Sequence, residues 1–129
     1  MTRKILAIDD SPTLRKLLRY YLSRRGYEVS EANNGKAGLD FIMRENFDLV
    51  ILDMEMPVMK GDAVLHKLKE MGNFSVPVLI LSADKDEENK AKAIELGASF
   101  YLTKPFKPDE VVSRIENIFV EKEKKNKPQ

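Results

Sequence analysis

The sequence has 129 residues and a formal net charge of +1, with 43% hydrophobic and 33% charged residues. This size fits one domain with a single core, and the composition is typical of a globular rather than a disordered chain. The small net charge gives no field that would attract nucleic acid or an acidic membrane. The sequence contains no cysteine, which excludes disulfides, a thiol nucleophile and a zinc site built on thiolates.

From the sequence we expect neither a signal peptide near Met1 nor a membrane helix. Only four apolar residues separate Thr2-Arg3-Lys4 from Asp9, which does not resemble a signal peptide. No apolar run approaches the roughly 20 residues of a membrane helix, so we expect a cytoplasmic protein. We expect residues 1–120 to form the domain and residues 121–129 to be a charged C-terminal tail that frays or extends the last helix.

Strand and helix signals alternate through the first half of the chain. Short apolar runs predict strands, and apolar residues at spacings of three and four predict helices. The elements are, in order, a strand at Ile5–Ile8, a helix from Pro12, a strand at Tyr27–Ala32, a turn at Asn33-Asn34-Gly35, a helix at Lys36–Glu45, a strand at Leu49–Leu52 and a helix at Gly61–Glu70. Ser11 is a suitable N-cap for the first helix, and Gly26 is suited to end it.

The second half continues the same alternation. It predicts, in order, a strand at Val76–Leu81, a helix at Glu87–Leu96 closed by Gly97, a strand at Phe100–Leu102 and a helix from Pro108. Asp109 and Glu110 lie in the first turn of this last helix, where they complement its dipole.

The alternating pattern indicates an α/β fold. Strands that are apolar throughout favour a parallel sheet with helices on both faces and right-handed crossovers. About five such units make a doubly wound five-stranded sheet. Sheets of this kind place their sites at the carboxyl ends of the strands, next to the point where the strand order reverses.

Polar residues follow four of the five predicted strands. Asp9 and Asp10 follow the first, Asp53 the third, Ser82 the fourth and Lys104 comes after the fifth. Asp9 alone, or Asp53 alone, would be explained by a helix cap or a turn. Three carboxylates at one edge repel one another unless a cation offsets them, and Mg²⁺ prefers such oxygen ligands together with phosphate. With a lysine and a hydroxyl beside them, these residues predict phosphoryl transfer to Asp53 as nucleophile.

The same residues, in this order and spacing, resemble the receiver domains of two-component response regulators, particularly the chemotaxis-type single-domain proteins. The resemblance covers residues 3–120. It is carried by Asp9-Asp10, Asp53-Met54-Glu55-Met56-Pro57, Gly61, Ser82-Ala83, Gly97-Ala98, Tyr101 and Lys104-Pro105-Phe106. It implies a flavodoxin-like fold with strand order 2-1-3-4-5.

The resemblance also implies a role for each of these residues. The implied roles are phosphoacceptor for Asp53; Mg²⁺ ligands for Asp9, Asp10, Asp53 and the Glu55 carbonyl; phosphate binding for Lys104, Ser82 and Ala83; switch residues for Ser82 and Tyr101; tuning of dephosphorylation for Glu55 and Asp84; and a cis peptide bond before Pro105.

The function implied is a stand-alone signalling module that is not an enzyme beyond its own phosphorylation and dephosphorylation. It would receive the phosphoryl group from a sensor histidine kinase or a phosphotransfer protein. It would then relay that group, or signal to a protein partner through the fourth helix, fifth strand and fifth helix, as a monomer or a phosphorylation-dependent dimer.

Two other functions stay open at this point. A Mg²⁺-dependent hydrolase of the haloacid-dehalogenase type also uses an aspartyl-phosphate, although its nucleophile follows the first strand in an Asp-x-Asp pattern, whereas Asp9 and Asp10 are adjacent here. The second alternative is a purely structural docking domain, in which replacing Asp53 by alanine would leave partner binding unchanged.

Overall fold

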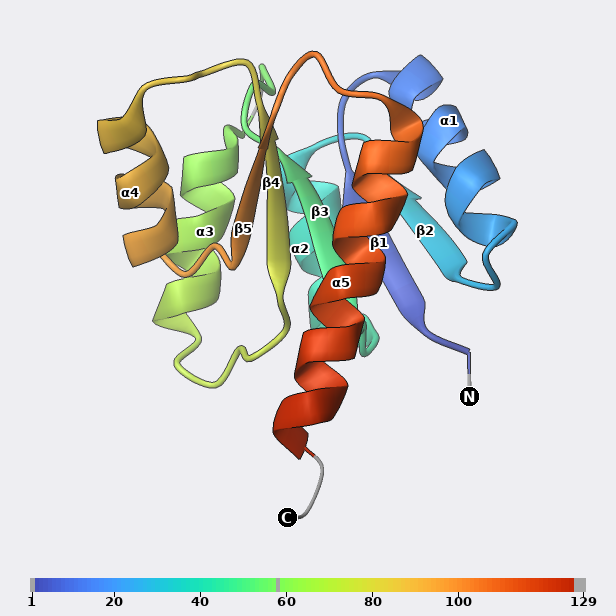
Figure 1. Ribbon diagram of the computed structural model, residues 1–129. Coiled ribbons are helices and arrows are strands. Elements are labelled where there is room, and N and C mark those ends of the chain that lie inside the picture. The colour runs from blue at the N-terminus through green and yellow to red at the C-terminus, as the bar shows by residue number, and fades with distance from the viewer. Residues whose placement is uncertain (1, 58, 127–129) are drawn as a thin grey trace.

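A central sheet of five parallel strands carries five helices (Figure 1). The computed structural model describes residues 2–57 and 59–126. Its elements are β1 (Lys4–Ile8), α1 (Pro12–Ser23), β2 (Glu28–Ala32), α2 (Gly35–Arg44), β3 (Leu49–Asp53), α3 (Gly61–Glu70), β4 (Val78–Ser82), α4 (Glu87–Glu95), β5 (Phe100–Thr103) and α5 (Pro108–Asn126).

The strand order is β2-β1-β3-β4-β5, so the predicted doubly wound, flavodoxin-like fold is confirmed. The order reverses between β1 and β3, which are hydrogen-bonded neighbours in the middle of the sheet. All carboxyl ends point to the same edge, the upper one in Figure 1. This edge at the reversal point is where doubly wound sheets form their sites.

The core consists of two layers, one on each face of the sheet. Successive side chains of a strand point to opposite faces, so that Ile5 and Ala7 pack in one layer while Leu6 and Ile8 pack in the other. Helices α1 and α5 cover the first layer, and α2, α3 and α4 cover the second (Figure 1). Every residue of β3 and β4 is buried, which explains why these strands are apolar along almost their whole length.

Strands β2 and β4 begin later than the sequence pattern predicts. The N–H of Tyr27 donates to the carbonyl of Leu22 at the end of α1, 3.2 Å away, so this residue belongs to the helix terminus and not to β2. Val76 precedes Pro77, which has no N–H to donate to a neighbouring strand, and β4 begins at Val78.

Several other bounds differ from the prediction by one residue, among them the start of α2 and the end of β3. Gly35 was assigned to a turn but is the first residue of α2, because the Asn34 side chain accepts a hydrogen bond from Ala37 N and caps the helix there. Asp53 was expected just beyond its strand but is the last residue of β3, paired in register with Leu81. The phosphoacceptor candidate is thus held by the sheet itself.

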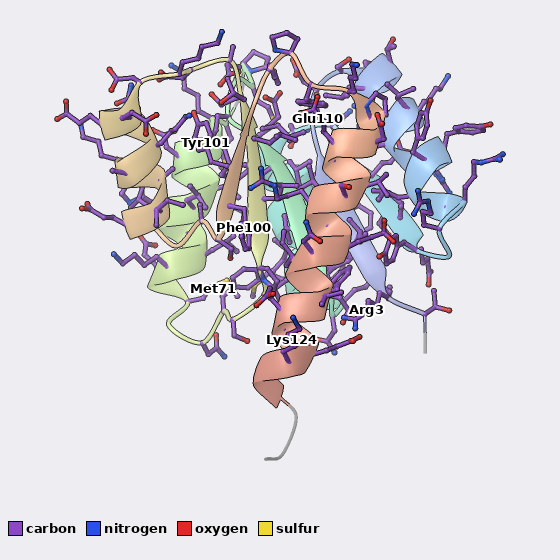
Figure 2. The ribbon with its side chains drawn as sticks, viewed as in Figure 1. Arg3, Met71, Phe100, Tyr101, Glu110 and Lys124 are labelled. Atoms are coloured by element: carbon purple, nitrogen blue, oxygen red, sulfur yellow. The ribbon has the colours of Figure 1, made fainter. Side chains whose placement is uncertain are left out.

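Helix α5 continues into the segment that was expected to fray or to extend it. Residues 121–126 extend the helix, and residues 127–129 of the predicted tail lie outside the described residues. Arg3 forms an ion pair with Glu123, and Figure 2 labels Arg3 and Lys124 at this end of the helix. Within residues 2–57 and 59–126, no helix combines the length and apolar character needed to cross a bilayer.

Gly61, the first residue of α3, approaches the backbone at the end of β3. A Cβ at this position would lie 2.8 Å from Met54 Cα and 2.9 Å from the Asp53 carbonyl oxygen, both of which are backbone atoms. We therefore expect Gly61→Ala to lower the free energy of unfolding by about 1–3 kcal/mol through overpacking. Urea unfolding measures this change. The control is Lys60→Ala, which alters an exposed neighbour with no side-chain cap and is expected to stay within about 0.5 kcal/mol of the wild type.

Candidate functional site

The structure brings three carboxylates together where β1 and β3 end. One oxygen from each of Asp9, Asp10 and Asp53 lies within 4.8 Å of the others. Asp9 and Asp53 are only 1% exposed, whereas Asp10 faces solvent. Adjacent parallel strands bring these side chains together because β1 and β3 are neighbours at the reversal of the strand order.

One carboxylate oxygen of Asp9 is buried without a hydrogen-bond partner among the described residues. This oxygen is Oδ2, whereas Oδ1 accepts a hydrogen bond from Ser11 N at 2.8 Å. Burial raises the pKa of Asp9 to about 6; the Ser11 hydrogen bond opposes this shift and the charge of Asp53 adds to it.

This cluster has the chemistry of a divalent cation site. A buried carboxylate oxygen without a donor is stabilised by binding a cation. Mg²⁺ uses one or two carboxylates and keeps several waters, which suits two buried aspartates and one that is open to solvent. The residues present therefore fit the Mg²⁺ that the sequence predicts at this edge of the sheet.

Lys104 supplies the positive charge of the site. Its Nζ lies 2.7 Å from Asp53 Oδ1 and 3.6 Å from Glu55 Oε1. Burial lowers the pKa of Lys104, but the hydrogen bond and charge of Asp53 outweigh that effect and leave the pKa above its usual value. Lys104 follows β5, its N–H donates to the Ser82 carbonyl at 2.8 Å, and the peptide bond before Pro105 is cis, as the resemblance implies.

The donors that were expected to bind phosphate are bound to the Glu55 carboxylate. Ser82 Oγ donates to Glu55 Oε2 at 2.6 Å, and Ala83 N donates to Glu55 Oε1 at 2.7 Å. The resemblance implies a backbone ligand role for Glu55 and an effect on dephosphorylation, and this side-chain contact is an addition to those roles. Its position two residues after Asp53 indicates that Glu55 lies near the site, but not which donors its carboxylate binds.

Tyr101 and Asp84 connect this group of residues to β5 and α4. The Tyr101 hydroxyl donates to the carbonyl oxygen of Asp84 at 3.0 Å, and Asp84 N donates to Ser82 Oγ at 3.1 Å. The Asp84 carboxylate accepts hydrogen bonds from Asp86 N and Asn89 Nδ2, which lower its pKa. The carboxylate that was expected to tune dephosphorylation is therefore engaged at the start of α4.

A cavity of about 380 Å³ adjoins the site between α3 and α4. Glu55, Ser82 and Tyr101 contribute to its wall from the side of the sheet. Figure 2 labels Tyr101 on β5, nearer than Phe100 to the edge of the sheet that carries the site. Three basic residues also line the cavity: Lys60 just before α3, His66 on α3 and Lys92 on α4.

The fold and the acidic edge together define the class of CheY-like α/β domains, with a buried aspartate at the end of the third strand. Comparison with known sequences identifies the family within this class. Residues 5–116 match the response regulator receiver domain, and the chain belongs to this family.

Individual relatives agree with this assignment. The transcriptional regulatory protein SrrA of Staphylococcus aureus is 38% identical over 115 residues, which are 89% of this chain and 47% of that protein. The chain thus spans about half the length of the curated relatives it matches.

Two solved structures show the same fold in proteins of similar length. Chemotaxis response regulator CheY4 of Vibrio cholerae superposes with a TM-score of 0.86 at 30% identity, covering 92% of this chain and 99% of that one. A CheY-like receiver domain protein of Methanospirillum hungatei superposes with a TM-score of 0.89 at 27% identity, covering 98% and 100%.

Proposed function

We propose that this domain accepts a phosphoryl group on Asp53 in a Mg²⁺-dependent reaction with a sensor histidine kinase or a phosphotransfer protein. The main observation is the surroundings of Asp53: its carboxylate is buried, it is paired with Lys104 at 2.7 Å, and it lies beside two further aspartates. Membership of the receiver family supports this role. The transfer would be catalysed by the domain's own residues and not by a separate enzyme.

In the transfer step, an Asp53 carboxylate oxygen forms a bond to phosphorus while the bond from phosphorus to the donor imidazole nitrogen breaks. Asp9, Asp10, Asp53 and the Glu55 carbonyl would hold Mg²⁺, which when bound neutralises charge on the transferred oxygens. Lys104 offsets further negative charge, and the Ser82 hydroxyl and Ala83 N–H are placed to donate to the remaining oxygens. Positioning and electrostatic stabilisation of this kind account for most of phosphoryl-transfer catalysis.

The phosphorylated state would be reported by Ser82 and Tyr101. Phosphorylation replaces one charge by about −1.5 to −2 and adds acceptor oxygens, which would draw Ser82 towards them. Ser82 is linked to Tyr101 through Asp84, so a shift of Ser82 alters the partner of the Tyr101 hydroxyl.

This change would be read by a protein partner on the face formed by α4, β5 and α5, or the phosphoryl group would be relayed onward. Ile94 on α4 is 47% exposed and Val120 on α5 is 46% exposed, so both offer apolar contacts on these elements. We propose a monomer or a phosphorylation-dependent dimer, with Glu55 and Asp84 tuning the lifetime of the phosphoryl group. Residues 1–120 would form the signalling unit, and no nucleic acid or membrane contact is required.

Labelling with phosphoramidate tests this function without a cognate kinase. We expect intact-mass spectrometry to find one phosphoryl group per chain when Mg²⁺ is present and none when EDTA removes it. The phosphoryl group should map to Asp53. Sustained turnover of p-nitrophenyl phosphate would contradict the proposal and favour the hydrolase alternative.

A further inference from the structure

The side chain of Glu55 occupies the place where phosphoryl oxygens would bind. Its two carboxylate oxygens accept hydrogen bonds from Ser82 Oγ and Ala83 N at 2.6 and 2.7 Å, and Lys104 Nζ lies 3.6 Å from Oε1. These are a hydroxyl, a backbone N–H and an ammonium, the same three donors that the proposed function assigns to the phosphoryl group.

We propose that Glu55 is an internal competitor, whose carboxylate takes the phosphoryl-binding donors in the unphosphorylated domain and must leave them when Asp53 is phosphorylated. This inference rests on the proposed function. One hydroxyl hydrogen and one N–H cannot make full hydrogen bonds to Glu55 and to a phosphoryl oxygen at the same time. A carboxylate held beside a dianionic group is also destabilised by like-charge repulsion.

The structure provides a route for the displaced carboxylate. The Glu55 side chain is 44% exposed, so it is held by its hydrogen bonds rather than by packing around it. It already lines the cavity of about 380 Å³ between α3 and α4, to which Lys60 and Lys92 also contribute. Rotation into this cavity would move the negative charge of Glu55 away from Asp53, into a lining that carries Lys60 and Lys92 as well as Asp62 and Asp84.

Competition of this kind has a measurable cost for any anion that binds at Asp53. Charge-assisted hydrogen bonds are about twice as strong as neutral ones. An incoming anion must break those between Glu55 and the donors of Ser82 and Ala83 before it can form hydrogen bonds to the same donors. Removing the Glu55 carboxylate should therefore tighten the binding of a phosphoryl analogue. The expected gain is about tenfold, which corresponds to about 1.4 kcal/mol.

The test measures beryllofluoride binding by ¹H–¹⁵N NMR titration at saturating Mg²⁺, with Mg²⁺ affinity determined separately for each variant. We expect Glu55→Ala to bind beryllofluoride about tenfold more tightly than the wild type. Glu55→Gln should gain less, because its amide oxygen still accepts from one donor. Before beryllofluoride is added, the Ala83 amide proton should move upfield in Glu55→Ala, since its charged acceptor has gone.

Asp62→Asn is the matched control. Asp62 lines the same cavity, but its carboxylate accepts from Ala63 N and does not bind Ser82, Ala83 or Lys104. Unchanged affinity in Asp62→Asn shows that the gain is not a general effect of removing one charge. If Glu55→Ala and Glu55→Gln gain the same beryllofluoride affinity and the Ala83 amide proton does not shift, charge repulsion alone explains the gain. That result would overturn the inference.

Different results would overturn the competitor role of Glu55 and the phosphoacceptor function of the domain. If the wild type binds beryllofluoride and Glu55→Ala binds it no more tightly, the competitor role is wrong while the phosphoacceptor function stands. If neither the wild type nor any variant binds it, the phosphoacceptor function is wrong, and the inference that rests on it is overturned as well.

Discussion

Asp53→Asn is expected to lose phosphoryl labelling by acetyl phosphate and Mg²⁺, to below about 1% of the wild-type yield. An amide is not a competent nucleophile towards phosphorus, and Asp53 is the buried carboxylate that contacts Lys104. The substitution keeps the size of the side chain, so the sheet around β3 should be undisturbed. Intact-mass spectrometry followed by peptide mapping measures the label.

The control for this prediction is again Asp62→Asn, which removes an exposed carboxylate near the site without touching Lys104. It should be labelled like the wild type. A label that persists in Asp53→Asn, on Asp9, Asp10 or elsewhere, would show that the phosphoacceptor has been assigned to the wrong residue.

Asp9→Asn is expected to stabilise the metal-free protein by about 1–2 kcal/mol at pH 7. Burial raises the pKa of Asp9 from 3.8 to about 6, so the ionised carboxylate destabilises the folded state. In Asp9→Asn, the side-chain oxygen can still accept from Ser11 N, and the new NH₂ group lies near the Asp10 and Asp53 carboxylates. Urea unfolding in EDTA measures the gain.

The difference in unfolding free energy between Asp9→Asn and the wild type should depend on pH, and its direction follows from the raised pKa of Asp9. Because the pKa is higher in the folded state, the folded protein binds this proton more tightly than the unfolded chain does. The stabilisation that this proton provides is complete below about pH 4 and is lost as the pH rises to about 6. The advantage of Asp9→Asn over the wild type should therefore grow across this range and level off above it.

Adding Mg²⁺ should favour the wild type over Asp9→Asn, the reverse of the order expected in EDTA. Mg²⁺ bound at the proposed site would stabilise the folded wild type by mass action, whereas Asp9→Asn lacks one of the proposed ligands and should gain much less. If Asp9→Asn is less stable than the wild type in EDTA, the buried Asp9 oxygen has a partner in solution and the proposed metal site is wrong at this residue.

The fold could be predicted because β1, β3 and β4 are buried on both faces and are therefore short runs of apolar residues. Such runs, separated by helical spacing, are typical of a doubly wound sheet. The start of β2 could not be predicted, since it depends on which backbone partner Tyr27 finds, whereas the start of β4 is marked in the sequence by Pro77. Tyr27 bonds to the end of α1, and Pro77 cannot donate to β3.

Much of the candidate site followed from topology alone. Parallel strands end at one edge, so the positions of Asp9, Asp53 and Lys104 at or just beyond the ends of their strands were enough to place them together. The contact between the Glu55 carboxylate and Ser82 could not be placed in this way. It depends on the rotamer of a partly exposed side chain, and sequence spacing does not determine a rotamer.

Tyr101 and Ser82 both bind the backbone of Asp84, because the Tyr101 hydroxyl donates to its carbonyl oxygen and Ser82 Oγ accepts from its N–H. Any protein that favours one orientation of the Tyr101 ring also biases Ser82. By linkage, the factor by which the phosphoryl group changes the affinity for that protein equals the factor by which the protein changes the affinity for the phosphoryl group. An output partner that binds the phosphorylated domain more tightly would therefore also shift the equilibrium towards the phosphorylated state.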